Sequence, residues 1–250
     1  KFNIIVDGLQ EVLGENEIKA ILNERDLRIY WGTATTGKPH IGYLKPLLKL
    51  CHFLKADCEV TILFADLSSY STITENMSPE VALEFLNEYF TKMHEVIKEF
   101  DGHTLNYIGD SVMVVFGAPK KLKSHENLAV KCSLKMQEKL KKLNQEWDDK
   151  ETSRYWKNHG IDSITMRIGI HTGSVIAGNV GSQEMRQYST IGDTVNVAAR
   201  LEQSNKDFKT EIAFSHEIYI ALTKELYNQA SLSGEIILKG RTSPTKVYSI

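Results

Sequence analysis

Between residues 58 and 250, strand-like apolar runs alternate with amphipathic segments of helical spacing, and some strand-like runs follow one another after only a short turn. The run EVTILFAD precedes a helical pattern that begins at Ser78 and Pro79 and ends near Gly102. The stretch LNYIGDSVMVVFGAP instead alternates on both sides of a Gly-Asp pair, as a β-hairpin does. Strands, helices and hairpins in this order predict an α/β (α+β) fold, a mixed sheet with flanking helices.

The remaining elements of this part follow the same logic. Helical spacing returns over about 125–147, in the short segment TVNVAARLEQS and over 215–226. Strands are predicted for ITMRIGIHTG and EIAFS, and a terminal hairpin for GEIILKGRTSPTKVYSI. Residues 148–160 are polar and aperiodic, so we predict a loop there.

The first 57 residues have a different character. An apolar run, a glycine-rich turn, an amphipathic run and a second apolar run predict a partial Rossmann-like strand–helix–strand unit. The preceding LQEVLGENEIKAILNERD predicts a short helix pair broken at Gly14. We therefore expect two segments, 1–57 and 58–250.

Composition limits the kinds of protein that fit. Hydrophobic residues make up 42% and charged residues 25%, as in ordinary globular domains. A formal charge of −2 gives no electrostatic reason to expect nucleic acid or an anionic membrane as a partner. Cys51, Cys58 and Cys132 form no CxxC pair, which favours a reducing compartment over a disulfide framework. No run of about 20 apolar residues predicts a membrane span.

Two carboxylates are candidates for chemistry. Asp66 ends an apolar strand, and Asp110 lies in a turn between two strands. Either residue alone is ordinary as a turn former or helix cap. Brought together on adjoining strand ends, the pair could hold Mg²⁺ through oxygen ligands and leave positions for phosphates.

A second candidate pair is Asn196 and Arg200, which share one helix face because they lie four residues apart. A solvated helix face is the plain alternative, and an amide and guanidinium clamp on a phosphate is the functional one. The tempting GTATTGKP does not fit a phosphate loop, because Pro39 replaces the hydroxyl residue and removes a backbone donor. For His40 and His171 we expect structural roles.

From about residue 58 the order of motifs resembles the catalytic domain of class III nucleotidyl cyclases. VTILFADLSSYS is similar to the first metal strand of that family, YIGDSVMVVFGAP to its metal hairpin, and MRIGIHTGSVIAGNVG to its central strands. YSTIGDTVNVAARLE resembles the transition-state segment, and ILKGRTSPTKVYSI the closing hairpin. The resemblance implies a ferredoxin-like mixed sheet.

The resemblance also implies roles for single residues. Two Mg²⁺ or Mn²⁺ ions would be held by Asp66 and Asp110, assisted by the Leu67 carbonyl. Asn196 would orient the ribose and Arg200 would stabilise charge on the α-phosphate. Further substrate contacts fall at Lys239 for the terminal phosphates and at Asn106 and Ser189 for the base.

The base positions depart from the usual pattern of the family. Adenylyl cyclases usually carry Lys with Asp or Thr at these positions, and guanylyl cyclases carry Glu with Cys. Ser189 is close to the Thr variant, which favours ATP, whereas Asn106 keeps an amide donor without the charge.

Residues 1–65 resemble the start of the catalytic domain of eukaryotic and archaeal tyrosyl-tRNA synthetases. PHIGY, from Pro39 to Tyr43, occupies the place of the His-Ile-Gly-His signature. No second signature loop follows and only one strand–helix–strand unit is present, so aminoacylation is not expected.

The sequence thus predicts an adenylyl cyclase that converts ATP to cyclic 3′,5′-AMP and pyrophosphate at a homodimer interface. The expected location is the cytoplasm, with any tether lying outside this sequence. A guanylyl cyclase and a catalytically silent cyclase-homology module that regulates a partner are the alternatives, and a synthetase fragment is a third.

Overall fold

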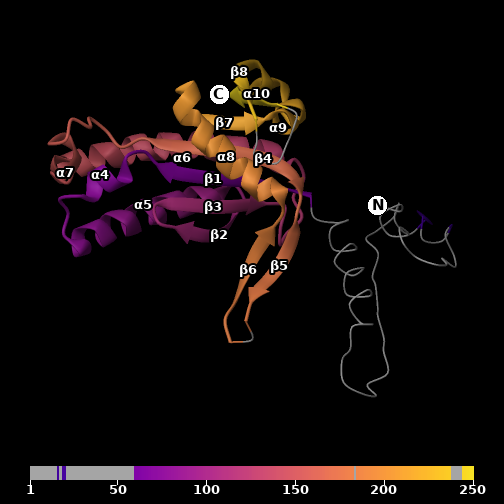
Figure 1. Cartoon of the computed structure of the whole chain (residues 1–250), viewed down its shortest axis with the longest axis horizontal. Coiled ribbons are helices and arrows are strands. Elements are labelled where there is room, and N and C mark those ends of the chain that lie inside the picture. The colour runs from indigo at the N-terminus through magenta and orange to yellow at the C-terminus, as the bar shows by residue number, and fades with distance from the viewer. Residues whose placement is uncertain (1–15, 17–18, 21–58, 183, 238–243) are drawn as a thin grey trace. The chain divides into compact units, whose positions relative to one another are not determined.

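The structure is a computed structural model that describes residues 16, 19–20, 59–182, 184–237 and 244–250 (Figure 1). Residues 59–250 form one compact unit, which carries every element below. Its strands are β1 (Glu59–Leu67), β2 (His103–Ile108), β3 (Ser111–Phe116), β4 (Met166–Ser174), β5 (Ile176–Gly181), β6 (Arg186–Ile191), β7 (Ile212–Ser215), β8 (Ser231–Ile236) and β9 (Thr245–Ser249). Its helices are α4 (Tyr70–Thr74), α5 (Pro79–Glu99), α6 (His125–Asp149), α7 (Arg154–Lys157), α8 (Asp193–Phe208), α9 (His216–Ala221) and α10 (Lys224–Gln229).

Within this unit, seven of the strands form one mixed sheet in the order β2-β3-β1-β4-β7-β9-β8. Among the described strands, β4 and β7 alone pair in parallel, and α8 lies in the crossover between them. The other neighbours are antiparallel, including β1 with both β3 and β4. The predicted mixed sheet with flanking helices is therefore confirmed.

Both faces of the sheet are covered. The larger core lies on the side of α5, α6 and α9, and Leu63, Ala65 and Leu67 of β1 belong to it. On the other face, α8 contacts β4, β1 and β7 and contributes Val197 and Leu201 to a second, smaller core. Alternate residues of β1 point to opposite faces, so Asp66 lies on the α8 side.

The two long helices form as the sequence predicts. Ser78 caps α5 by accepting a hydrogen bond from the Val81 N–H (3.4 Å), and Pro79 is the first helical residue. The helix buries five apolar residues along one face, namely Phe85, Tyr89, Met93, Val96 and Ile97. In α6, Cys132, Met136, Leu140 and Leu143 are buried in the same core.

The strands β5 and β6 form a separate two-stranded hairpin, which projects from the body of the sheet in Figure 1. Towards the tip of this hairpin, Gln187, which pairs with Val180, donates a hydrogen bond from Nε2 to the Leu105 carbonyl of β2 (2.8 Å). Met185 at the tip is 77% exposed. Of the segment MRIGIHTGSVIAGNVG, which resembles the central strands of the cyclase family, only β4 joins the main sheet.

The loop predicted over 148–160 is wrong in part. The helix α6 continues to Asp149, and the short α7 lies inside the segment. Trp156 is the cause, because it is buried with its ring centroid 5.5 Å from that of Trp147 and 5.9 Å from that of Phe85. A single apolar anchor in a polar stretch leaves no periodicity to detect.

The single helix predicted over 215–226 is also wrong, because α9 and α10 are separate. Asn127 of α6 accepts from the Thr223 N–H (2.7 Å) and donates to the Ala221 carbonyl (2.8 Å). These bonds replace the helical ones at the break, and Asn127 lies 94 residues from Ala221 and 96 residues from Thr223 in the sequence. TVNVAARLEQS proved to be the middle of a longer helix, α8.

Several predictions lie outside the described residues. These are the early helix pair, the strand–helix–strand unit of residues 1–57, His40 and Lys239. The boundary between residues 57 and 58 falls at the edge of the described part and stays a prediction. Within the described part, no helix is both long and apolar enough to cross a membrane.

We predict that Gly169→Ala disrupts the seating of α8 on the sheet. A Cβ at Gly169 would lie 2.1 Å from the Glu202 nitrogen and 2.3 Å from the Ala198 carbonyl oxygen, and both contacts are backbone. Overpacking against backbone should lower the free energy of unfolding by about 3 kcal/mol or more. Urea denaturation measures this loss. Gly178→Ala is the matched control, because nothing lies within 4 Å of its Cβ, and an equal loss in both variants would contradict the account.

Candidate active site

Asp66 lies near the end of β1 and is held by two neighbouring strands. Ser111 of β3 donates a hydrogen bond from Oγ to its Oδ1 (2.5 Å). Arg167 of β4, its direct partner in the β1–β4 register, donates from Nη2 to Oδ2 (2.7 Å). The Asp66 side chain keeps 21% of its surface exposed. The carboxylate is thus fixed in orientation but remains reachable from solvent.

Asp110 occupies the turn between β2 and β3, next to Asp66. The turn is tight because Ile108 pairs with Ser111, and Gly109 takes a positive φ of 62° that suits glycine. Burial and the nearby charge of Asp66 raise the pKa of Asp110, although a hydrogen bond from the Leu67 N–H opposes the shift. The predicted pairing of the two carboxylates is therefore present in the structure.

A third carboxylate, that of Glu202, lies on the other side of Arg167 from Asp66. Glu202 of α8 is buried, with 9% of its side chain exposed, and its Oε1 lies 2.9 Å from Nε of Arg167. Burial is the main cause that raises the pKa of Glu202 to about 7, and the charge of Asp66 adds to the shift while Arg167 opposes it. One guanidinium therefore lies between Asp66 and Glu202.

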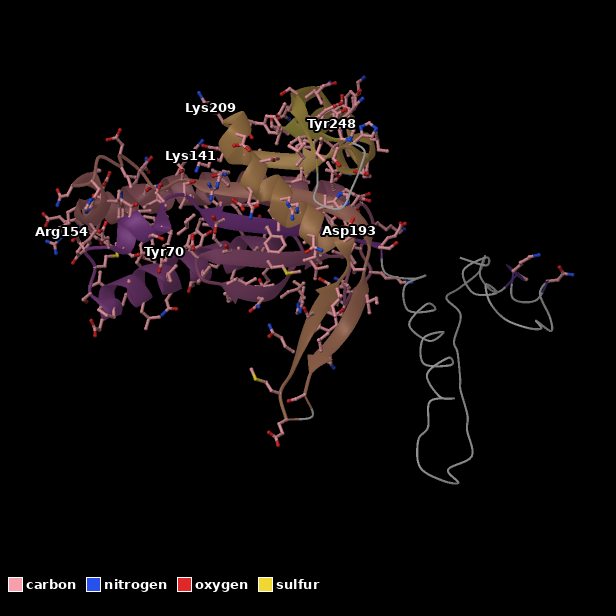
Figure 2. The ribbon with its side chains drawn as sticks, in the orientation of Figure 1. Tyr70, Lys141, Arg154, Asp193, Lys209 and Tyr248 are labelled. Carbon is pink, nitrogen blue, oxygen red and sulfur yellow. The ribbon has the colours of Figure 1, made fainter. Side chains whose placement is uncertain are left out.

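The structure does not bring Asn196 and Arg200 to this cluster. Both side chains are exposed on α8, whereas Val197, Leu201 and Glu202 on the same helix are buried. Figure 2 labels Asp193 and Lys209 at the two ends of this helix. Asn196 and Arg200 do share one face of α8, as predicted, and in the single chain that face is exposed to solvent.

The base candidates lie on neighbouring elements. Asn106 is exposed on β2, and Ser189 is half-buried on β6, where it pairs with Gly178 of β5. The strands β2 and β6 contact each other, and the centroids of the His103 and Tyr188 rings lie 5.6 Å apart. Lys239, the third substrate candidate, lies outside the described residues.

Sequence reasoning missed Ser111, Arg167 and Glu202. Each lies in a motif that was recognised, but none has a local pattern that marks it as a partner of Asp66. Only the strand register and the seating of α8 reveal these contacts. His171, expected to be structural, is buried with Nδ1 2.8 Å from the Ser215 hydroxyl.

The donor set suits a hard divalent cation. Asp66 and Asp110 supply carboxylate oxygens, and their mutual repulsion is a cost that a bound cation would remove. Among the described residues no group of three or more His, Cys, Asp or Glu side chains could hold a metal ion. Substrate oxygens or water would have to complete the coordination of any ion bound here.

The fold and the paired carboxylates define an α/β domain with a candidate cation site at one end of its central strands. Residues 54–250 match the family described as "Adenylate and Guanylate cyclase catalytic domain". The chain belongs to this family.

Individual relatives agree with this assignment. "Adenylate cyclase 1" of Rhizobium meliloti is 35% identical over 192 residues, 77% of this chain and 27% of that protein. The crystal structure of the adenylyl cyclase CyaB from P. aeruginosa superposes with a TM-score of 0.63 at 28% identity, over 76% of this chain and 92% of that one.

A second group of relatives matches the N-terminal part of the chain. "Tyrosine--tRNA ligase, cytoplasmic" of Danio rerio is 50% identical over 107 residues, 42% of this chain. The chain spans about a fifth of the length of that protein (20%) and about a quarter of the Rhizobium meliloti cyclase (27%).

We predict a pH-dependent difference in stability between the metal-free protein and Glu202→Gln. A carboxyl whose pKa is higher in the folded than in the unfolded state binds more protons when folded. Its contribution is therefore fully present below about pH 4.5 and is lost as the pH rises towards about 7. Urea denaturation in EDTA between pH 5 and pH 8 should show that the free energy of unfolding falls more steeply in the wild type. Parallel pH profiles would contradict the assignment.

Proposed function

We propose that residues 58–250 are a catalytic domain that converts ATP to cyclic 3′,5′-AMP and pyrophosphate. The observation that supports this most is the pairing of Asp66 and Asp110 on adjoining strand ends of a cyclase-family domain. Two divalent cations are the expected cofactors. Asp66 and Asp110 would hold them, with the Leu67 carbonyl as a further oxygen ligand.

The reaction joins the ribose 3′-oxygen to the α-phosphorus while the bond from that phosphorus to the bridging oxygen of pyrophosphate breaks. Bound Mg²⁺ or Mn²⁺ would lower the pKa of the 3′-hydroxyl and neutralise the phosphate charge. Ser111 and Arg167 would orient Asp66 through their hydrogen bonds, so that its carboxylate oxygens face the substrate.

Asn196 and Arg200 are proposed to act from a partner chain. Asn196 would orient the ribose, and Arg200 would stabilise the charge that develops on the α-phosphate. Both are exposed on α8 and absent from the Asp66–Asp110 cluster of their own chain, which supports a composite site in a homodimer. Lys239 is proposed to reach the terminal phosphates.

Asn106 and Ser189 are proposed to contact the base. The hydroxyl of Ser189 favours adenine, and the uncharged Asn106 makes guanine the runner-up. A silent regulatory module is the third candidate. The chain retains both carboxylates and both α8 residues, which argues against it; these are Asp66, Asp110, Asn196 and Arg200.

For residues 1–57 we propose no aminoacylation. The ligase match covers 107 residues, 42% of this chain, so it runs beyond these 57 residues, and it spans only 20% of that relative. We propose that it is a separate segment that adds no ligand to the cyclase site.

Product analysis tests the proposal directly. Incubation with ATP or GTP and Mn²⁺ should yield cyclic AMP in excess over cyclic GMP. Asp66→Asn and Asp110→Asn should each lower turnover about a thousandfold or more, because a metal clamp supplies several kcal/mol to the transition state. Asp149→Asn, an exposed acid at the end of α6, is the matched control and should keep wild-type turnover. Excess cyclic GMP would establish the guanylyl alternative, and neither product at high protein concentration would favour the silent module.

The composite site predicts complementation between two inactive variants. Asp66→Ala and Arg200→Ala should each be inactive as homodimers, but a mixed dimer has one site with both defects and one with none. Random exchange makes half the dimers mixed, so about a quarter of the wild-type site density should return. Activity of the separate and mixed variants measures this recovery. A mixture that stays inactive, although mass spectrometry shows heterodimers, would refute the shared site.

A further inference from the structure

The ion pair between Arg167 and Glu202 is incomplete in a specific way. The Arg167 Nε and the Glu202 Oε1 are 2.9 Å apart, yet both atoms are buried and neither has an aligned hydrogen bond. Buried polar atoms are almost always satisfied, so a pair left unaligned at contact distance calls for an explanation.

The geometry of the guanidinium supplies one. Arg167 donates from Nη2 to Asp66 Oδ2 at 2.7 Å, and Asp66 and Glu202 lie on different elements, β1 and α8. In the observed orientation the guanidinium is aligned with Asp66 and not with Glu202, although its N–H donors point in several directions. Glu202 is the second partner, in contact but unused.

The fold keeps Glu202 in this place. Gly169, two residues after Arg167 on the same face of β4, lets the backbone of α8 touch the strand at Glu202. The contact buries the Glu202 side chain to 9% exposure, whereas Arg167 keeps 25%. The acid is therefore the fixed member of the pair and the arginine is the member with room to turn.

We propose that Glu202 is a positioning residue that receives Arg167 when a divalent cation binds Asp66. The proposal rests on the cation site of the proposed function. A cation at Asp66 repels the guanidinium, and rotation onto Glu202 satisfies both unaligned atoms. Glu202 thus lowers the free energy of displacing Arg167 and strengthens metal binding.

The proposal predicts opposite effects for the two members of the pair. Glu202→Gln leaves a displaced Arg167 without an anionic acceptor, so the dissociation constant for Mn²⁺ should rise about tenfold, as expected for one charge-assisted hydrogen bond. Arg167→Gln removes the competitor at Asp66, so Mn²⁺ should bind at least as tightly as in the wild type. Glu202→Asp keeps the charge and should recover part of the loss.

The test is a Mn²⁺ titration of the full chain in which electron paramagnetic resonance measures free Mn²⁺, with a thermal melt of each variant. Glu211→Gln is the matched control for loss of a nearby negative charge, because Glu211 lines a surface hollow together with Arg167. In the Arg167→Gln background, Glu202→Gln should shift binding no more than Glu211→Gln does. If Glu202→Gln weakened Mn²⁺ binding about tenfold in the Arg167→Gln background as well, Glu202 would act by its charge alone, and the proposal would be overturned.

Equal binding by Glu202→Gln and Glu211→Gln in the wild-type background would also overturn it, since Glu202 would then be only structural. Asp66→Asn separates this failure from failure of the proposed function. If Asp66→Asn weakens Mn²⁺ binding but Glu202→Gln does not, the metal site stands and the role of Glu202 falls. If Asp66→Asn binds Mn²⁺ as the wild type does, the metal site is wrong and the role of Glu202 falls with it.

Discussion

The antiparallel pairing of β1 with β3 on one side and β4 on the other determines the candidate site. Its registers place Asp66 opposite Arg167 and bring the β2–β3 turn, with Asp110, beside the end of β1. A shift of one residue in either pair would turn these side chains to the opposite face of the sheet. Two carboxylates that repel each other are therefore held together by backbone hydrogen bonds elsewhere in the strands, and a cation bound between them would remove that repulsion.

The second constraint is the close contact of α8 with β4. Because Gly169 has no side chain, the helix rests on the strand through backbone atoms. This seating buries Glu202 beside Arg167 and leaves Asn196 and Arg200 on the outer face. One helix thus serves two purposes in the proposed dimer. On its inner face, Glu202 would act through Arg167 on Asp66 of the same chain. On its outer face, Asn196 and Arg200 would contact the substrate held by the partner chain.

Much of this architecture could be predicted from the sequence because short-range residue patterns determine it. The cap at Ser78, the stripe of α5 and the Gly-Asp hairpin each follow from a few neighbouring residues. The contacts that were missed are not local. Arg167 and Glu202 become partners of Asp66 only through strand register and helix seating, and the break between α9 and α10 depends on Asn127 of a distant helix. Trp156 shows the same limit, because one buried side chain orders a segment that has no periodicity.

The central claim is that Asp66 and Asp110 form one cation site that another chain completes. The most direct measurement is anomalous scattering from crystals grown with Mn²⁺ and a non-hydrolysable ATP analogue. The account predicts manganese peaks within coordination distance of both carboxylates, with Asn196 and Arg200 of a partner chain against the ribose and the α-phosphate. Manganese bound elsewhere, or a nucleotide contacted by Asn196 and Arg200 of the same chain that supplies Asp66, would contradict it.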